Sequence, residues 1–408
     1  MDGRVGRTAS ANLLKGVLLP IDRIEVFVTQ LPQRVQRRLV SGIWDTGPAT
    51  ELLGKPVLVK VFADGIVGIG QVRPLAPSHI VADSTFSTIA AIREIYGPRL
   101  IGLDLFDHEL HAIELDRGMA GNPAPRAVLD HALHDAMGKA LGVPVYKLLG
   151  GLSQPRIPLE WSVGFSDKAD DMILEARKAV EEFGLPVICL KAGHPRGWRT
   201  DVENIRAVRQ ALGQGVAIGV DPNEGWSVTD TLEALPILRE LDIAYLEQPI
   251  ARRNIAGLAR IQAVSKGLPL MADESLFTLA DAFELAEAHA VDVFCVKLYK
   301  VGGIRRARKI AAVAEAAQIK LNAGAVCAFS QLEAAASGHF YASLPAQHTL
   351  GAAEFVGGLG VFGPDPLVPE PSWTIVDGHV APPSAPGLGV SIDERRLKDL
   401  ALLHDVIE

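Results

Sequence analysis

The sequence has few cysteines and lacks an excess of positive charge. Its three cysteines, Cys189, Cys295 and Cys327, lie far apart with no CxxC spacing, which argues against a disulfide framework or a zinc ribbon. The formal net charge is −8, which disfavours a protein that binds nucleic acid or an anionic membrane through a large positive surface. We therefore expect a cytoplasmic protein whose partners are small molecules.

Long apolar runs and glycine-rich phosphate loops are also missing. The one signal-like stretch, Leu13 to Leu19, is too short to span a bilayer, and we interpret residues 1–19 as a flexible leader. No GxGxxG follows the first predicted strand, and GxxxxGK[ST] does not occur, which disfavours a doubly wound open sheet with a phosphate-binding turn.

Residues 20–152 have the pattern of an α+β capping domain. Ile21 to Phe27 is predicted as a strand, residues 57–72 as a hairpin around Asp64-Gly65, and residues 124–141 as a helix that ends at Gly142. Gln33 to Pro48, which carries Trp44, is polar and is interpreted as a loop of the length that often serves a site.

Residues 153–356 alternate short apolar, β-branched runs with amphipathic helices. This alternation indicates parallel strands buried on both faces, and about eight of them close into a TIM-type (β/α) barrel of the α/β class. The predicted strands are residues 157–163, 186–190, 216–220, 243–246, 268–272, 291–296, 319–321 and, weakly, 350–355. Residues 357–408 are rich in Gly and Pro and are expected to return to the capping domain.

Five successive runs end in a charged residue, at the face of the barrel where active sites lie. They end at Lys191, Asp221, Glu247, Asp273 and Lys297, and the three acids are spaced 26 residues apart. Three carboxylates on one rim would repel one another, so a bound cation is the economical explanation. Oxygen ligands favour Mg²⁺, with Mn²⁺ as a second choice.

The two lysines would flank this cation from opposite sides. Burial and a neighbouring cation would lower a lysine pKa toward neutrality, which suits a base, and the metal would stabilise the enediolate formed beside a carboxylate. A metal-independent enzyme with Lys191 or Lys297 as a Schiff-base nucleophile is the alternative of another class. A non-enzymatic binding scaffold is disfavoured because all three acids and both lysines are present.

The order Lys, Asp-x-Asn, Glu-Gln-Pro, Ala-Asp-Glu, Lys-x-x-Lys-x-Gly-Gly resembles the mandelate racemase/muconate lactonizing enzyme family of the enolase superfamily, muconate-lactonizing branch. Residues 127–151 and Pro386-Gly387-Leu388-Gly389-Val390 are similar to further family segments, so the resemblance covers roughly residues 20–400. It implies a modified (β/α)7β barrel under an α+β cap whose first loop selects substrate. It also implies metal ligands at Asp221, Glu247 and Asp273, an acid/base pair at Lys191 and Lys297, and supporting residues at Asn223 and Glu274.

The sequence departs from the family pattern at several positions. The first lysine of the usual Lys-x-Lys is Cys189, no glutamate follows the seventh strand, and Glu354 is the best polar group of the eighth. Lys300, Glu354, Trp44 and Cys189 are therefore candidates for supporting or substrate-binding roles. The resemblance implies a muconate cycloisomerase-like isomerase or lyase acting on a small carboxylate. A racemase or epimerase of an amino-acid or betaine derivative, or an acid-sugar or hydroxy-acid dehydratase, stays open, and a homo-oligomer is expected.

Overall fold

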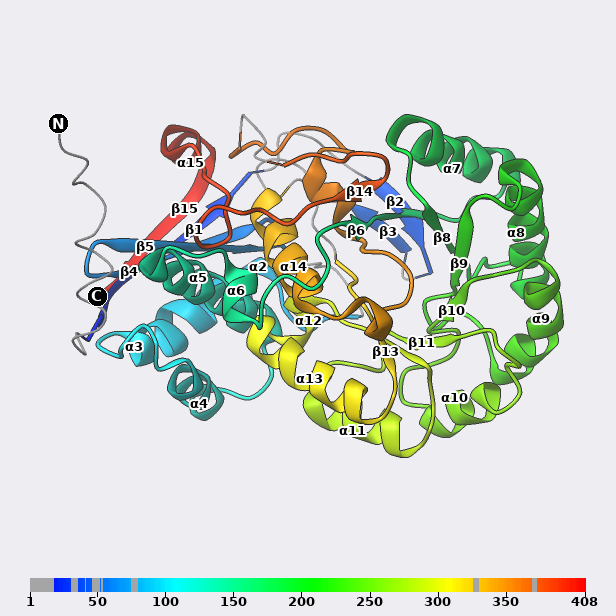
Figure 1. Cartoon of the computed structure of the whole chain (residues 1–408), viewed down its shortest axis with the longest axis horizontal. Coiled ribbons are helices and arrows are strands. Elements are labelled where there is room, and N and C mark those ends of the chain that lie inside the picture. Colours follow the sequence, from blue (N-terminus) through cyan, green and yellow to red (C-terminus); the bar gives the residue numbers. More distant parts are fainter. Residues whose placement is uncertain are drawn as a thin grey trace.

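The computed structural model describes residues 18–408 except 31–35, 41, 46–51, 53, 75–79, 326–329 and 369–372. Residues 1–17 of the predicted leader lie outside the described residues, as does the side chain of Trp44. Two bodies lie side by side in Figure 1: an antiparallel sheet with helices on the left, and a ring of strands surrounded by helices on the right. The predicted fold class, a helix-covered parallel barrel beside a separate antiparallel sheet, is confirmed.

The antiparallel sheet has the order β15-β1-β4-β5 and joins the two ends of the described chain. Its β4 and β5 strands form the predicted hairpin, with Ala63 paired to Ile66 around the Asp64-Gly65 turn. The strands are β1 (Ile21–Thr29), β4 (Val57–Ala63), β5 (Ile66–Val72) and β15 (Ala401–Ile407). The accompanying helices are α2 (Thr85–Ala91), the π-helical η1 (Ile92–Tyr96), α3 (Gly97–Leu100), α4 (His108–Gly118), α5 (Pro123–Leu141) and α6 (Val145–Leu148).

Helix α5 lies directly on strand β5 because the strand has two glycines on the facing side. A Cβ atom at Gly68 would lie 2.1 Å from the Ala132 carbonyl oxygen, and one at Gly70 would lie 2.2 Å from that of Val128. The Gly-x-Gly motif thus permits close backbone approach. Asp135 on the same helix accepts hydrogen bonds from the Leu388 amide (2.7 Å) and the Ile69 amide (2.7 Å), so the carboxyl-terminal segment is tied to this helix.

The polar stretch Gln33 to Pro48 was expected to be a loop, but its described residues form a β-hairpin. Strands β2 (Gln36–Leu39) and β3 (Gly42–Asp45) pair antiparallel, which satisfies backbone hydrogen-bonding groups that an irregular loop would leave to water. The hairpin contacts the barrel, because a Cβ atom at Gly193 would lie only 2.2 Å from Cγ2 of Val40. The expectation of an irregular loop is therefore wrong for residues 36–39 and 42–45.

Seven parallel strands form the curved sheet, in the order β13-β12-β11-β10-β9-β8-β7. They are β7 (Glu160–Val163), β8 (Val187–Lys191), β9 (Ala217–Asp221), β10 (Tyr245–Glu247), β11 (Leu270–Ala272), β12 (Val293–Cys295) and β13 (Lys320–Asn322). Residues 349–354 close the ring, since Leu350 donates to Leu321 (2.9 Å) and Ala353 donates to Pro158 (2.9 Å). The weakly predicted eighth strand is thus a bridging segment between both sheet edges, and Phe355 already begins a 3-10 helix.

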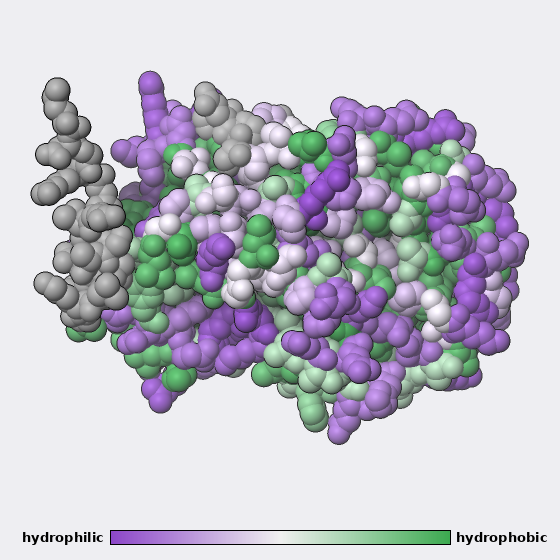
Figure 2. All heavy atoms as spheres, in the orientation of Figure 1, coloured by the Kyte–Doolittle hydropathy of each residue, from purple (hydrophilic) through white to green (hydrophobic). Residues whose placement is uncertain are grey.

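Most of the outer helices bury one apolar face against this ring and expose the other, but α12 (Leu298–Val301) and α14 (Gln331–Ser343) are buried almost completely. Hydrophilic residues cover the outer surface over α8 and α9 in Figure 2. Local signals set the helix limits: α9 begins at a Ser227–Asp230 capping box, and α7 ends at Gly184 in the left-handed region. The helices are α7 (Ala169–Phe183), α8 (Trp198–Leu212), α9 (Val228–Glu240), α10 (Ile255–Gln262), α11 (Leu279–Glu287), α12 (Leu298–Val301), α13 (Ile304–Ala316) and α14 (Gln331–Ser343).

The remaining short elements connect the barrel to the carboxyl-terminal segment. Strands β6 (Ile157–Pro158) and β14 (His379–Val380) pair antiparallel. The others are η2 (Ala346–His348), η3 (Phe355–Leu359) and α15 (Glu394–Leu400). In the part of the chain that the structure describes, we find no helix with the length and apolarity needed to span a bilayer.

Candidate active site

The charged residues singled out from the sequence meet at the carboxyl ends of neighbouring strands. Lys191, Asp221 and Glu247 are the last residues of β8, β9 and β10. Asp273 follows β11 directly, and Lys297 lies two residues beyond β12. All five are buried or nearly so, with Asp221 fully inaccessible and Glu247 exposed by 1%. Parallel strands bring these positions together because their ends share one rim.

Each lysine pairs with a different acid. Nζ of Lys191 lies 2.5 Å from Oδ2 of Asp221, and Nζ of Lys297 lies 2.7 Å from Oδ2 of Asp273. Glu247 stands between the two pairs: a carboxylate oxygen of Glu247 comes within 4.8 Å of one on Asp221 and within the same distance of one on Asp273. The two ammonium groups therefore approach the acidic cluster from strands β8 and β12.

Burial and the neighbouring charges together determine the pKa values in this cluster. Burial, and then repulsion from Asp221, raises the pKa of Glu247 well above its usual range. Burial alone would lower the pKa of both lysines, but the surrounding carboxylates outweigh it, Asp221 first for Lys191 and Asp273 first for Lys297, so both are raised. This differs from the lowered lysine pKa expected from the sequence, because that expectation included a neutralising cation.

The residues present fit a hard divalent cation. Oε1 of Glu247 is buried and has no hydrogen-bond partner among the described residues, an arrangement that costs free energy unless a ligand satisfies the oxygen. Asp221, Glu247 and Asp273 supply the oxygen atoms that Mg²⁺ prefers. Cys189 and Cys295 lie within 4.8 Å of these acids, but burial raises the pKa of both thiols, so they stay neutral and are poor ligands for Mg²⁺.

Two of the less certain candidates, Asn223 and Lys300, contact the acids directly, and a third, Glu274, is hydrogen-bonded to Asn223. Asn223 donates from Nδ2 to Asp221 (2.9 Å) and to Glu274 (3.0 Å). Nζ of the inaccessible Lys300 donates to Oδ1 of Asp273 (2.5 Å) and to its backbone carbonyl (2.6 Å). These contacts orient the acids, so Asn223, Glu274 and Lys300 belong to the surroundings of the cluster.

The other candidates, Glu354, Cys189 and Trp44, differ in how near the structure places them to the cluster. Glu354 reaches the cluster from the bridging segment, with Oε2 3.6 Å from Nζ of Lys297 and Oε1 accepting from Ser162 (3.1 Å). Cys189 is fully buried two residues before Lys191. The backbone of Trp44 pairs with Arg37 in the β2–β3 hairpin, but its side chain lies outside the described part of the chain.

Sequence reasoning missed two side chains below this rim. Glu160 is exposed by 1%, and its Oε2 accepts a hydrogen bond from the hydroxyl of the inaccessible Tyr245 (2.8 Å). The available signal was a carboxylate inside the predicted strand 157–163, since an ionisable group is rarely buried without a specific partner.

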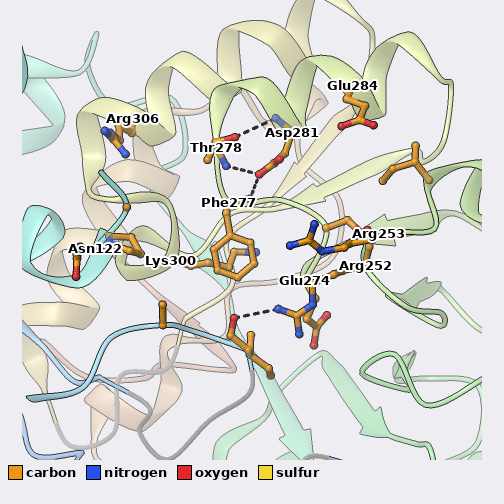
Figure 3. Close-up of a pocket in the computed structure, with 16 residues that line it drawn as sticks. Asn122, Arg252, Arg253, Glu274, Phe277, Thr278, Asp281, Glu284, Lys300 and Arg306 are labelled. Atoms are coloured by element: carbon orange, nitrogen blue, oxygen red, sulfur yellow. Dashed lines mark hydrogen bonds between the residues drawn. The ribbon is translucent and has the colours of Figure 1, made fainter. Parts of the chain in front are cut away.

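A cleft of about 600 Å³ lies beside the acidic cluster. Glu274 and Lys300 line it, but the two lysines and three acids of the cluster do not. Figure 3 shows the ring of Phe277 next to Lys300 and the Thr278–Asp281 hydrogen bonds at the start of α11. Arg252 crosses the cleft to the Ile80 carbonyl (3.1 Å), so this wall joins the antiparallel-sheet region to the barrel.

Comparisons with known proteins cover both bodies. Residues 171–396 match the family described as "Enolase C-terminal domain-like", and residues 49–150 match the mandelate racemase/muconate lactonizing enzyme N-terminal domain. The chain belongs to the mandelate racemase/muconate lactonizing enzyme family of the enolase superfamily. The resemblance inferred from the barrel motifs is thereby confirmed.

Members of this family with related sequences include two kinds of isomerase. A chloromuconate cycloisomerase of Pseudomonas sp. (strain P51) is 34% identical over 345 residues, which are 84% of this chain and 90% of that protein. An N-succinyl-L-Arg/Lys racemase of Bacillus cereus is 30% identical over 396 residues, 95% of this chain and 100% of that protein. The chain is therefore an enzyme, an isomerase or lyase resembling muconate cycloisomerases.

Solved structures agree with this assignment. The muconate lactonizing enzyme of Pseudomonas fluorescens, complexed with muconolactone, superposes with a TM-score of 0.85 at 32% identity and covers 94% of this chain and 100% of that one. The Bacillus cereus N-succinyl Arg/Lys racemase gives a TM-score of 0.84 at 29% identity, with 96% and 100% covered.

Proposed function

We propose that this enzyme is a Mg²⁺-dependent isomerase or lyase that removes the proton beside the carboxylate of a small acid, in the manner of muconate cycloisomerases. The observation that carries the proposal is the arrangement of two lysines, the largely buried Lys191 at the end of β8 and the buried Lys297 after β12, on either side of three buried acids. Lysine is a competent base only where its surroundings can shift its pKa, and this cluster combines burial with several charges.

Asp221, Glu247 and Asp273 would hold Mg²⁺, or Mn²⁺ in its place, and the metal would supply positive charge where an enediolate develops. Neutralising the acids would release the Nζ atoms of Lys191 and Lys297 from their ion pairs. One lysine would then take the proton from one face of the substrate, and the other would hold a proton on the opposite face. Asn223 and Lys300 would keep Asp221 and Asp273 oriented through the bonds described above.

Racemisation or epimerisation of an acylated amino acid or a betaine is the second candidate. Two facing lysines can remove a proton from one side and return it on the other, and the Bacillus cereus racemase aligns with 95% of this chain. Dehydration of a hydroxy acid by the same first step ranks third. The Schiff-base alternative would require activity that survives chelation and a lysine that borohydride labels in the presence of a carbonyl substrate.

The test is metal-dependent α-proton exchange in D₂O, followed by NMR over muconates, acylated amino acids and proline betaines. Exchange or turnover that chelator abolishes and Mg²⁺ restores would support the mechanism and identify the substrate class. Lys297→Ala should bind the metal as the wild type does and lose α-proton exchange. Glu181→Gln, a substitution of an exposed residue, is the control variant and should exchange like the wild type. Exchange that is unaffected by chelator would contradict the metal-dependent proposal.

We further propose that the enzyme works in the cytoplasm as a homo-oligomer. Cys189 and Cys295 are free, buried thiols, which suits a reducing compartment, and the family resemblance favours an oligomer. Sedimentation velocity on the purified full chain would test the second point, since a monomer at micromolar concentration would contradict it.

A further inference from the structure

Glu160 is a buried carboxyl group that the proposed mechanism does not use. It begins strand β7, is exposed by 1%, and receives a 2.8 Å hydrogen bond from the hydroxyl of Tyr245 on β10, 85 residues away in the chain. Among the described residues, no lysine or arginine nitrogen is paired with it within 4.0 Å. A carboxylate in such a place costs much more free energy than a neutral carboxylic acid.

The Tyr245–Glu160 contact is built into the barrel. Tyr245 is inaccessible, and its ring occupies the space beside Gly219, where a Cβ atom would lie 2.0 Å from the ring. Glycine at this position of β9 therefore makes room for the aromatic ring. The hydroxyl cannot reach water and finds its partner in Glu160, as buried tyrosines usually require.

The surroundings of Glu160 carry excess negative charge. Its carboxylate, that of Glu354 and the Cys189 thiol lie within 4.8 Å of one another. Cys189 stands where the family resemblance implies a lysine, so a neutral group replaces a cation. Three lysines, Lys191, Lys297 and Lys300, share this interior with six carboxyl groups. The carboxyl groups are those of Glu160, Asp221, Glu247, Asp273, Glu274 and Glu354. The positive charge of the three lysines and a divalent cation would not balance the negative charge of all six groups, if ionised, together with a substrate carboxylate.

We propose that Glu160 is a positioning residue: as a neutral carboxylic acid held by Tyr245, it donates its proton toward Glu354 and thereby keeps Glu354 directed at Lys297. This inference rests on the proposed role of Lys297 in proton transfer. Glu354 already accepts from Ser162 and lies 3.6 Å from Nζ of Lys297. A third contact, from the neutral carboxylic acid of Glu160, would fix the carboxylate of Glu354 without adding a negative charge that competes for Lys297.

The charges that face the two glutamates support opposite protonation states. Burial, and then repulsion from Glu354, raises the pKa of Glu160 to about 8, against the smaller opposing effects of Tyr245, Lys191 and Lys297. Burial alone would raise the pKa of Glu354 as well, but Lys297 and Lys191 outweigh it and lower that pKa. At neutral pH the pair therefore shares one proton, which resides on Glu160.

Infrared difference spectroscopy tests the protonation state without any substrate. The spectrum of the wild-type full chain minus that of Glu160→Gln, recorded at neutral pH, should contain the carbonyl band of a protonated carboxyl group. If the difference spectrum lacks that band and shows carboxylate bands instead, Glu160 is ionised and the proposal is wrong. Tyr245→Phe is the second variant. Loss of the hydrogen bond from the Tyr245 hydroxyl should shift the carbonyl band of Glu160 without removing it, and an unshifted band would contradict the proposal that Tyr245 holds Glu160.

The pH profile of α-proton exchange tests the positioning role. Glu160→Gln, which stays neutral and can still donate to Glu354, should retain kcat within about threefold, whereas Glu160→Leu should lose about tenfold or more in kcat with little change in KM. Wild-type exchange should fall as Glu160 ionises above about pH 8, and Glu160→Gln should lack that alkaline limb. Equal kcat in the Leu and Gln variants, or an unchanged limb, would overturn the inference.

The two failures can be told apart. If no substrate in the panel exchanges with wild-type protein, the proposed function fails while the infrared band still decides the protonation state of Glu160. If exchange occurs but the Glu160 variants behave like the Glu181→Gln control, the proposed function is supported and the positioning role of Glu160 is wrong.

Discussion

Replacing Gly219 by alanine should destabilise the barrel through Tyr245. The added Cβ atom would lie 2.0 Å from Cζ of the tyrosine ring and 2.4 Å from its hydroxyl, closer than any real contact. Tyr245 is fully buried, so its ring must shift within a closely packed interior. That shift would break the 2.8 Å hydrogen bond to Glu160.

The expected loss combines overpacking with a broken buried hydrogen bond. Overpacking costs about 1–3 kcal/mol, and an unsatisfied buried partner adds about 1 kcal/mol, so Gly219→Ala should lower the free energy of unfolding by about 2–4 kcal/mol. Urea unfolding followed by tryptophan fluorescence would measure this. Gly215→Ala is the matched control, because a Cβ atom there meets nothing within 4 Å, and it should unfold like the wild type.

A double-mutant cycle would assign the loss to this contact. Tyr245→Leu alone should cost about 2–4 kcal/mol through the cavity it leaves, but combined with Gly219→Ala it removes the clash. The double variant should therefore lose less than the sum of the single variants, by about 1–3 kcal/mol. Strict additivity, or a Gly219→Ala variant as stable as the wild type, would refute the packing argument.

Three further predictions concern the metal site, the junction between the two bodies and the hairpin. Glu247→Gln should weaken Mg²⁺ binding by about tenfold or more in titration calorimetry, because it removes a charged oxygen ligand; unchanged affinity would contradict the ligand assignment. Asp130 accepts from the Ile304 amide (2.6 Å) and lies 3.3 Å from Nδ1 of His134. Burial would raise the pKa of Asp130, but His134 and His108 together outweigh it and lower that pKa. Burial would lower the pKa of His134, but Asp130 outweighs it and raises that pKa. The ion pair is thus complete above about pH 4 and below about pH 6.5, and its contribution fades as pH rises through the raised pKa of the histidine. Asp130→Asn should therefore cost more stability in urea at about pH 5.5 than at about pH 9; equal losses would refute the linkage. Asp167 accepts from Arg38 (2.9 Å) and contacts His194 (2.7 Å), so Asp167→Asn should speed hydrogen exchange in residues 36–45 and raise KM more than it lowers kcat.

The sequence alone was sufficient for the features that depend on local pattern. Alternating apolar runs and helices indicate a barrel, and the position of an acid at the end of each run places Asp221, Glu247 and Asp273 on one rim, where the structure has them. The helix now called α5 and the β4–β5 hairpin follow from helical periodicity and an Asp-Gly turn. These features can be predicted because the periods of strands and helices determine which faces are occupied by residues that are neighbours in the chain.

Only the tertiary structure decided which side chains meet across the barrel. Tyr245 reaches Glu160 over 85 residues because the strands curve into a ring and Gly219 leaves space for the aromatic ring. The pairing of each lysine with its own acid, and the closure of the ring by the irregular residues 349–354, likewise depend on strand stagger and on burial. No local pattern encodes such contacts, because they arise from the packing of segments whose separation in sequence carries no information about their distance in space.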